Sequence, residues 1–128
     1  MQEREIPASR WRDFFDFFST QHKDWITTIE IGERVEAREL PLVGVSADSK
    51  GSEPNAIEIE VGRDPSDHLT HIIDEAERVT FRQSDDEAQL ELEIESADGE
   101  KTAVRLRRAT RAEIQGRAAR ERSGGATG

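Results

Sequence analysis

The chain has 128 residues and no cysteine, which fits a single domain and excludes disulfides, thiolate metal sites and cysteine nucleophiles. Its formal net charge of −10 disfavours binding to nucleic-acid phosphates. No apolar run approaches the roughly 20 residues that a membrane span needs, and the polar N-terminus lacks an apolar signal-peptide core. We therefore expect a soluble, cytoplasmic protein that binds neither nucleic acid nor a membrane.

Residues 9–20 form the first predicted element, a helix with Ser9 as its N-cap. Aromatic residues recur there at the i, i+3, i+4 and i+7 spacing of one helical face: Trp11, Phe14, Phe15 and Phe18. We expect this face to cover the apolar side of a β-sheet. The alternative is an exposed sticky face for a partner or a second copy, with Phe17, just off the stripe, as the main contact beside Trp11 and Phe14.

From residue 25 onward, apolar and polar residues alternate, which is typical of strands with one buried face. The predicted strands span 25–31, 34–41, 43–47, 56–62, 79–83 and the two arms of a hairpin within 89–107. In the first hairpin, we expect Ile31 opposite Val35 and Ile29 opposite Ala37. Residues 48–55 are rich in turn-forming residues and predict a loop.

The last hairpin, QLELEIESADGEKTAVRLR, allows its register to be predicted. A two-residue turn at Asp98-Gly99 would put Leu92 opposite Arg105 and so mix the two faces. A three-residue loop, 97–99, pairs Leu with Leu, Leu with Val and glutamate with a basic residue on the correct faces. The expected pairs are Leu90–Leu106, Leu92–Val104, Ile94–Thr102, Glu91–Arg105 and Glu95–Lys101, with Gly99 in a left-handed conformation.

The segment DHLTHIID, residues 67–74, contains two of the three histidines, His68 and His71. Its periodicity slightly favours a helix with Asp64 as the N-cap, which would put both histidines roughly on one side. Its β-branched residues and its neighbouring strands favour a strand, on which the two side chains diverge. We favour the strand. The i, i+3 spacing also lacks the H-E-x-x-H pattern of helical zinc sites, so we expect no metal or cofactor.

Other catalytic patterns are absent from the sequence. It contains no G-x-S-x-G elbow, no phosphate-binding glycine loop and no calcium loop. The glutamates at 58, 60, 91, 93 and 95 alternate with apolar residues and predict a solvated sheet face. Arg105 and Arg107 should balance the charges of the preceding strand's glutamates, and a phosphate site is the minor alternative.

Together these elements predict a mainly β (α+β) single domain over residues 1–110. Its N-terminal helix packs on a small antiparallel meander barrel or sandwich of about eight short strands. Residues 111–128 contain one large apolar residue, Ile114, and predict a frayed or disordered tail.

Four segments of the chain are together distinctive: IPASRWRDFFDFFSTQHKDW, VEARELPLVGVSAD, GRDPSDHLTHIID and LEIESADGEKTAVRLR. They resemble a small bacterial family known only as domain of unknown function 5335. The resemblance covers roughly residues 5 to 108 and leaves the arginine-rich tail outside. It implies a bacterial single-domain protein and assigns no activity, cofactor, partner or functional residue.

The sequence best supports a non-enzymatic binding, regulatory or protein-interaction module. It would contact an unknown protein partner, or a second copy, through an edge strand or the Phe17 side of the helix. One alternative is a metal-dependent or acid–base enzyme centred on His68 and His71, with Asp64, Asp67 or Asp74 nearby. Another is a stress or salt-tolerance protein whose acidic surface is itself the functional feature.

Overall fold

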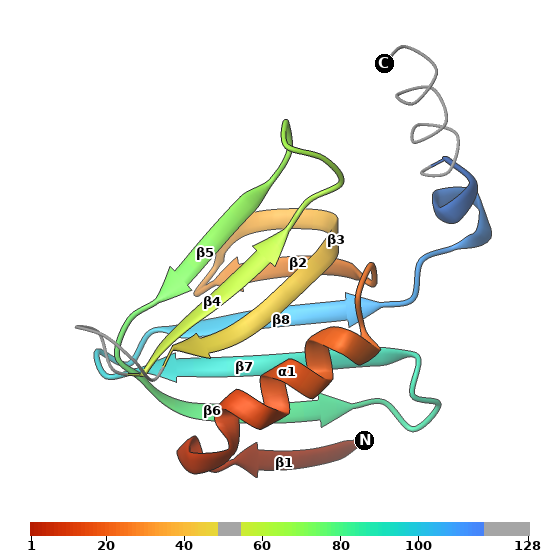
Figure 1. Cartoon of the computed structure of the whole chain (residues 1–128). Helices are drawn as coiled ribbons and strands as arrows, with labels where there is room; N and C mark the ends of the chain where they lie inside the picture. Colours follow the sequence, from red (N-terminus) through yellow and green to blue (C-terminus); the bar gives the residue numbers. More distant parts are fainter. Residues whose placement is uncertain (49–54, 117–128) are drawn as a thin grey trace.

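Eight antiparallel strands form one sheet in the computed structural model, which describes residues 1–48 and 55–116 (Figure 1). The helix α1 (Trp11–Gln21) follows a 3-10 turn at Ala8–Arg10 and packs on this sheet, and a short helix covers 111–116. The predicted mainly β fold, with an N-terminal helix on about eight strands, is confirmed. The strands are β1 (Gln2–Ile6), β2 (Ile26–Ile31), β3 (Arg34–Asp48), β4 (Ala56–Val61), β5 (Leu69–Ile73), β6 (Ala76–Gln83), β7 (Gln89–Ser96) and β8 (Lys101–Arg107).

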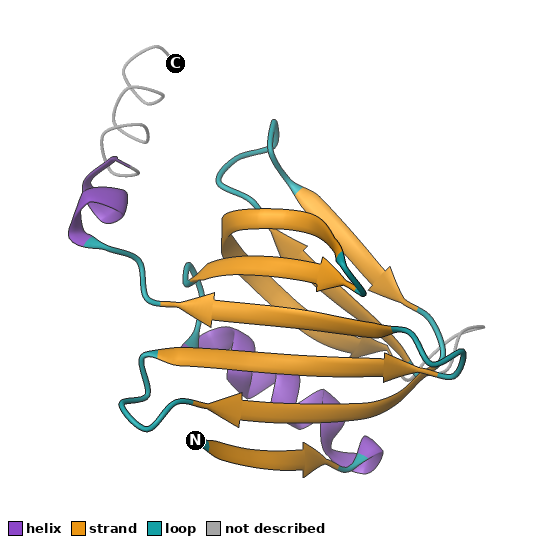
Figure 2. Cartoon of the chain, turned by 180° about the vertical axis from the view of Figure 1, so that it is seen from behind, coloured by secondary structure: helices purple, strands orange, loops and turns teal. Residues whose placement is uncertain are grey.

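The strand order is β1-β6-β7-β8-β2-β3-β4-β5, so β1 and β5 form the two edges. The sheet folds over on itself at β3. The first part of β3 pairs with β2 as far as Pro41, and its second part pairs with β4 from Leu42 onward. Register shifts accompany this change of partner, and Glu39 has a positive φ of 53°. In both views β4 and β5 lie across β2 and β8, which makes a sandwich-like arrangement (Figures 1 and 2).

The core lies between the two parts of the folded sheet and under α1. The inward side chains of β4, β7 and β8 are fully buried, among them Ile59, Leu92 and Val104. From α1, Phe15 and Phe18 enter the same core. Burial of this many large apolar side chains supplies the main driving force for folding, at about 1.5–3 kcal/mol for each fully buried side chain.

The helix α1 occupies the place of a strand beside the second part of β3. Ser19 bonds to the backbone of Val45 through its hydroxyl group. Further along, the backbone N–H of Asp24 donates to the carbonyl of Leu42 at 2.9 Å, and the N–H of Leu42 donates to the carbonyl of Trp25 at 2.8 Å. These contacts satisfy backbone groups of β3 that would otherwise form an open edge.

Local register was predicted well. All five predicted pairs of the β7–β8 hairpin are confirmed, and Gly99 has the expected positive φ, at 88°. In the β2–β3 hairpin, Ile29 lies opposite Ala37 as predicted. The prediction for Ile31 was wrong: it lies opposite Arg34, because register shifts around Ile29 displace the remaining pairs.

Three boundaries differ from the predictions. The helix begins at Trp11 and its N-cap is Arg10, so Ser9 lies in the preceding 3-10 turn. The strand β1 was not predicted, since its sequence QEREI buries only Ile6. The two strands predicted at 34–41 and 43–47 are one continuous strand, β3. Most of the predicted loop, 49–54, and the tail from 117 onward lie outside the described residues.

The predicted frayed tail begins with ordered structure. Thr110 and Glu113 form a reciprocal capping box: the N–H of Thr110 donates to the Glu113 carboxylate at 2.7 Å, and the N–H of Glu113 donates to Thr110 Oγ1 at 3.2 Å. Glu113 also accepts two hydrogen bonds from Arg107, at 2.9 and 3.1 Å. Polar contacts thus hold the short helix at 111–116, where the sequence has little apolar content.

Candidate functional site

The two histidines of DHLTHIID lie on opposite sides of β5. His71 pairs with the fully buried Ile59 of β4, so it shares the side of β5 that faces the core. His68 precedes the strand, and its Nε2 lies 3.2 Å from the hydroxyl of Thr70, on the solvent side. The same nitrogen is 3.8 Å from a carboxylate oxygen of Glu60. The strand interpretation is confirmed, and the two histidines do not face a common pocket.

His71 is half-buried and surrounded by charges of both signs. Burial lowers the pKa of its imidazole, while Glu36 and Glu100 oppose that shift and Arg34 adds to it. Within 1–48 and 55–116, no group of three histidine, aspartate or glutamate side chains is arranged to hold a metal ion. The geometry therefore gives no support to a site built from His68 and His71 together.

The loop between β4 and β5 is tightly closed, and its aspartates bond to the loop itself. The carboxylate of Asp67 accepts hydrogen bonds from the backbone N–H groups of Arg63 and Asp64, at 2.7 and 3.0 Å. Gly62 has a φ of 143°, and a Cβ placed there would lie 2.7 Å from the Cα of His68. Only glycine fits such a position without strain. The loop thus fixes the start of β5.

The outer edge of β5 is the main unpaired feature of the described sheet. β5 pairs with β4 along one side, and no described strand pairs with its other side. Its sequence, LTHII, contains no acidic residue, lysine, arginine or proline, and Ile72 is 55% exposed. Such an edge presents free backbone donors and acceptors to an incoming strand.

The opposite edge, β1, differs in chemistry. Three of its five residues are charged: Glu3, Arg4 and Glu5. Two of them are engaged with β6, since Glu3 pairs with Arg82 and Glu5 lies 3.3 Å from Arg78. Charged side chains on an edge strand discourage pairing with other chains. Of the two edges of the described sheet, β5 therefore lacks the charged side chains that β1 carries.

The helix residues suggested for partner contact have different environments. Phe17 is 66% exposed and available on the surface. Phe14 is partly buried, with its ring centroid 5.8 Å from that of Phe81 and with Arg4 over its face. Trp11 is only 3% exposed, and its indole N–H donates to the carbonyl of Ile6 at 2.8 Å. Trp11 therefore belongs to the core.

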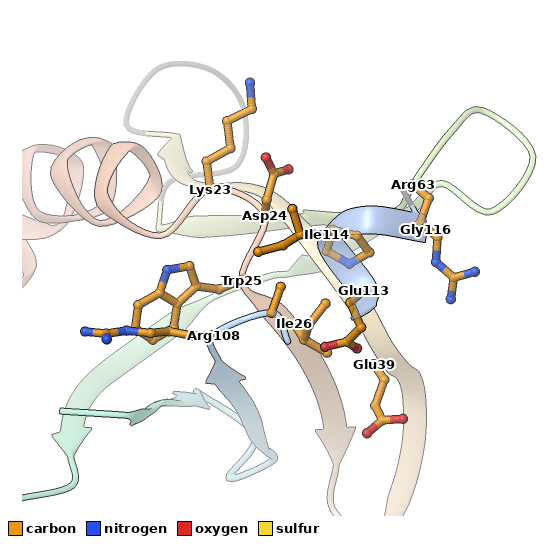
Figure 3. A pocket seen from close by; sticks show the side chains of 12 residues that line it. Lys23, Asp24, Trp25, Ile26, Glu39, Arg63, Arg108, Glu113, Ile114 and Gly116 are labelled. Atoms are coloured by element: carbon orange, nitrogen blue, oxygen red, sulfur yellow. The ribbon is translucent and has the colours of Figure 1, made fainter. Parts of the chain in front are cut away.

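A hollow of about 630 Å³ lies where α1 joins β2 and where the chain leaves β8 (Figure 3). Its apolar lining includes Trp25, Ile26 and Ile114, and the guanidinium of Arg108 lies 5.5 Å from the Trp25 ring centroid. Its rim carries charges of both signs. Among the lining residues, Lys23, Arg63 and Arg108 are basic and Asp24, Glu39 and Glu113 are acidic.

Two carboxylates beside this hollow, those of Glu39 and Glu113, form ion pairs with Arg107. The bidentate contact with Arg107 lowers the pKa of Glu113 to about 2, and the backbone N–H of Thr110 adds to the effect. A second contact joins Arg107 to Glu39 at 3.5 Å. Glu113 is thus charged at neutral pH and cannot serve there as a proton donor. The hollow therefore offers an apolar surface, and its Glu113 is held in the ion pair with Arg107.

Ion pairs cross the outer face of the sheet, where the alternating glutamates predicted a solvated face. Arg82 contacts Glu91 and Glu93, and Arg105 contacts Glu30 and Glu91. The predicted Arg105–Glu91 pair is confirmed. For Arg107 the prediction was wrong, because its side chain turns to Glu39 and Glu113. These residues balance charge between strands.

The third histidine was not singled out from the sequence. The Nδ1 of His22 lies 2.9 Å from the carbonyl of Phe18, and its ring packs between Phe18 and Trp25 at centroid distances of 4.4 and 4.8 Å. Burial lowers its pKa, which the contact with Phe18 partly offsets. Its spacing of four residues from Phe18 continues the aromatic stripe of α1 and could have indicated it, whereas its other partner, Trp25, comes from the segment that follows the helix. Its role is to pack the end of the helix.

Comparison with known proteins gives one match. The model of a family of unknown function, DUF5335, matches residues 2–115. The match reaches beyond the expected limit of residue 108 and includes the capped turn at 110–116 almost entirely. No curated protein and no solved structure matches the chain significantly. Among the described helices, none is long and apolar enough to cross a membrane.

Proposed function

Because the chain belongs to this family of unknown function, whose description carries no activity, we propose a function from the structure: a protein-interaction module that binds through the outer edge of β5. An extended segment of a second chain, either another protein or another copy of this one, would add to the sheet as a further strand. Backbone hydrogen bonds would supply affinity, and the side chains of Thr70 and Ile72 would supply selectivity.

One observation carries this proposal: β5 is an uncharged, β-branched edge strand in a protein whose other edge is charged. Unprotected edges favour aggregation, and natural proteins usually block them with charge, proline or a covering element. An edge that lacks these features is consistent with a binding surface. The exposed Ile72 adds an apolar contact beside the backbone groups.

The composition supports a cytoplasmic setting for this module. The chain contains no cysteine, which fits a reducing compartment. The net charge of −10 supports a protein partner over nucleic acid. The uncharged and partly exposed edge of β5 supports binding over catalysis.

The test uses a photo-reactive amino acid incorporated at Ile72 in cells that express the protein. The matched control carries the same group at Phe17, the exposed aromatic residue of α1. We expect Ile72 to give a protein adduct after illumination and Phe17 to give none. Adding Thr70→Lys should abolish the adduct, because a charge at the edge disfavours strand addition. Circular dichroism of the purified variants checks that each is folded.

The opposite pattern would overturn the proposal. Adducts at Phe17 alone would move the contact surface to α1. Adducts at Ile72 that persist with Thr70→Lys would show a contact that does not involve strand pairing. No adduct at either position would remove the reason for an interaction module.

A further inference from the structure

We infer that the strand added to β5 is β5 of a second copy of this chain, paired antiparallel about a two-fold axis at His71. The inference rests on the proposed function, because it names the partner of the same edge. It follows from the residues of β5, which match those of a second β5 that runs in the opposite direction.

The faces of β5 match in this arrangement. A two-fold axis perpendicular to the sheet keeps the core-facing sides of both copies on one side. Centred on His71, it places Leu69 opposite Ile73 of the second copy and the two His71 side chains opposite each other. On the solvent side, Thr70 lies opposite Ile72 of the second copy. All five residues of β5 then have a partner within β5.

The polar residues at the ends of the strand agree with the same register. Residue 68 lies opposite residue 74, so His68, whose ring can donate a hydrogen bond, meets the carboxylate of Asp74 of the second copy at both ends of the pair. A shift that centres the axis on Ile72 would put Leu69 opposite Glu75 and Thr70 opposite Asp74. A shift to Thr70 would put Asp67 opposite Ile73. Each alternative places an acidic group against an apolar residue and leaves fewer pairs within β5.

The protonation state of His71 allows the two His71 rings to face each other across the two-fold axis. Burial lowers the pKa of its imidazole, which keeps the ring neutral at neutral pH. Two neutral rings can face each other without the repulsion that two charged rings would suffer. The surrounding charged groups, Glu36 and Glu100 on one hand and Arg34 on the other, oppose one another.

Self-pairing of β5 also gives a closed dimer instead of an open chain of copies. Pairing β5 with β1 of another copy would be heterologous and would propagate into an open chain. The charges of β1 oppose that arrangement. Pairing β5 with itself closes at two copies and, among the described strands, leaves the two charged β1 edges unpaired.

The net charge of each copy predicts how salt affects this pairing. Two chains of charge −10 repel each other, although β5 itself is uncharged. Raising the salt from about 0.01 M to about 1 M shortens the screening length from about 30 Å to about 3 Å. The association should therefore become tighter with salt, which is the reverse of an interface held by ion pairs.

Single-cysteine variants test the register, because the natural chain has no cysteine. His71→Cys should form a disulfide-linked dimer under mild oxidation, since directly opposed Cα atoms lie about 4.5–5.5 Å apart. Thr70→Cys and Ile72→Cys should each form no disulfide when oxidised alone, because two residues of offset separate the identical positions by about 8 Å. Mixing these two variants should give the linked heterodimer. Glu5→Cys on β1 is the control that should not link.

Analytical ultracentrifugation of the natural chain provides the second measurement. We expect a concentration-dependent dimer that Ile72→Lys abolishes and that Gln2→Lys, the same type of charge on the β1 edge, leaves intact. A monomer at every concentration and salt, or equal linking by all three β5 cysteines, would overturn self-pairing.

The two proposals fail in different ways. If His71→Cys stays monomeric while the photo-reactive residue at Ile72 captures a different protein in a Thr70-dependent manner, self-pairing is wrong and the interaction module stands. If Ile72 captures nothing and the cysteine variants do not link, both are wrong. An Ile72 adduct between two copies of the chain, together with the His71→Cys dimer, supports both.

Discussion

The hydroxyl of Ser19 satisfies both backbone groups of Val45. Ser19 Oγ accepts a hydrogen bond from the Val45 N–H at 2.8 Å and donates one to the Val45 carbonyl at 2.9 Å. One side chain of α1 thus performs the role of a neighbouring strand at this point of β3. The contact explains why the second part of β3 is not an open edge, whereas β5 is.

Ser19→Ala should destabilise the fold by about 1–3 kcal/mol, because the partly buried backbone groups of Val45 lose their partner. Urea denaturation followed by circular dichroism measures the change. Thr20→Ala is the matched control, since its hydroxyl bonds only to the carbonyl of Asp16 on the exposed side of the helix. Its free energy of unfolding should change by less than about 0.5 kcal/mol. Equal effects of both variants would contradict the strand-replacing role of Ser19.

Gly62→Ala should destabilise the protein by about 1–3 kcal/mol, because the positive φ is strained for alanine and its Cβ would collide with the backbone of His68. The disturbance should concentrate in the loop that begins β5, so amide exchange should rise at residues 63–69. Gly116→Ala is the control, because a Cβ there meets no atom within 4 Å and its backbone is helical. An unchanged exchange pattern in Gly62→Ala would show that the loop does not depend on this close approach.

The free energy of unfolding should fall as the pH drops below about 6.5. Burial lowers the pKa of His22 and of His71 below that ordinary value in the folded state. The unfolded chain therefore binds more protons in the window below 6.5, and acid shifts the equilibrium toward unfolding. Urea denaturation between pH 7.5 and pH 5.5 measures this slope. The double variant His22→Gln with His71→Gln should show a flatter profile, and an unchanged slope would assign the effect to other groups.

Glu113→Gln should release the helix at 111–116 with little effect on the rest of the fold. The variant loses the charge-assisted bidentate contact with Arg107, while the partly exposed position keeps the global change below about 1 kcal/mol. Amide exchange of Ile114, whose N–H donates to the carbonyl of Thr110, reports the release directly. Because the pKa of Glu113 is about 2, acid should release the same turn between about pH 4.5 and pH 2, as the carboxylate takes up its proton. Protection of Ile114 that persists in Glu113→Gln would show that the turn is held by other contacts.

Which side chains point into the core and which point to solvent could be predicted where local rules of strand and turn geometry apply. Alternation placed Leu90, Leu92 and Ile94 inward and the glutamates between them outward, because successive side chains of a strand point to opposite faces. Turn chemistry placed Gly99, which fixed the register of the hairpin. For DHLTHIID the residue types outweighed a helical periodicity, and the strand was predicted correctly.

The sequence by itself determined the fold class, the aromatic face of α1, the β7–β8 register and the divergence of His68 from His71, because each depends on residues close together in the chain. Only the tertiary structure decided that β1 pairs with β6, that Ser19 closes the edge of β3 and that Trp11 is buried against Ile6. It also decided that β5 is the uncharged edge. Edge positions depend on which distant strands are neighbours, and the free energy of such pairings comes from contacts that local periodicity does not encode.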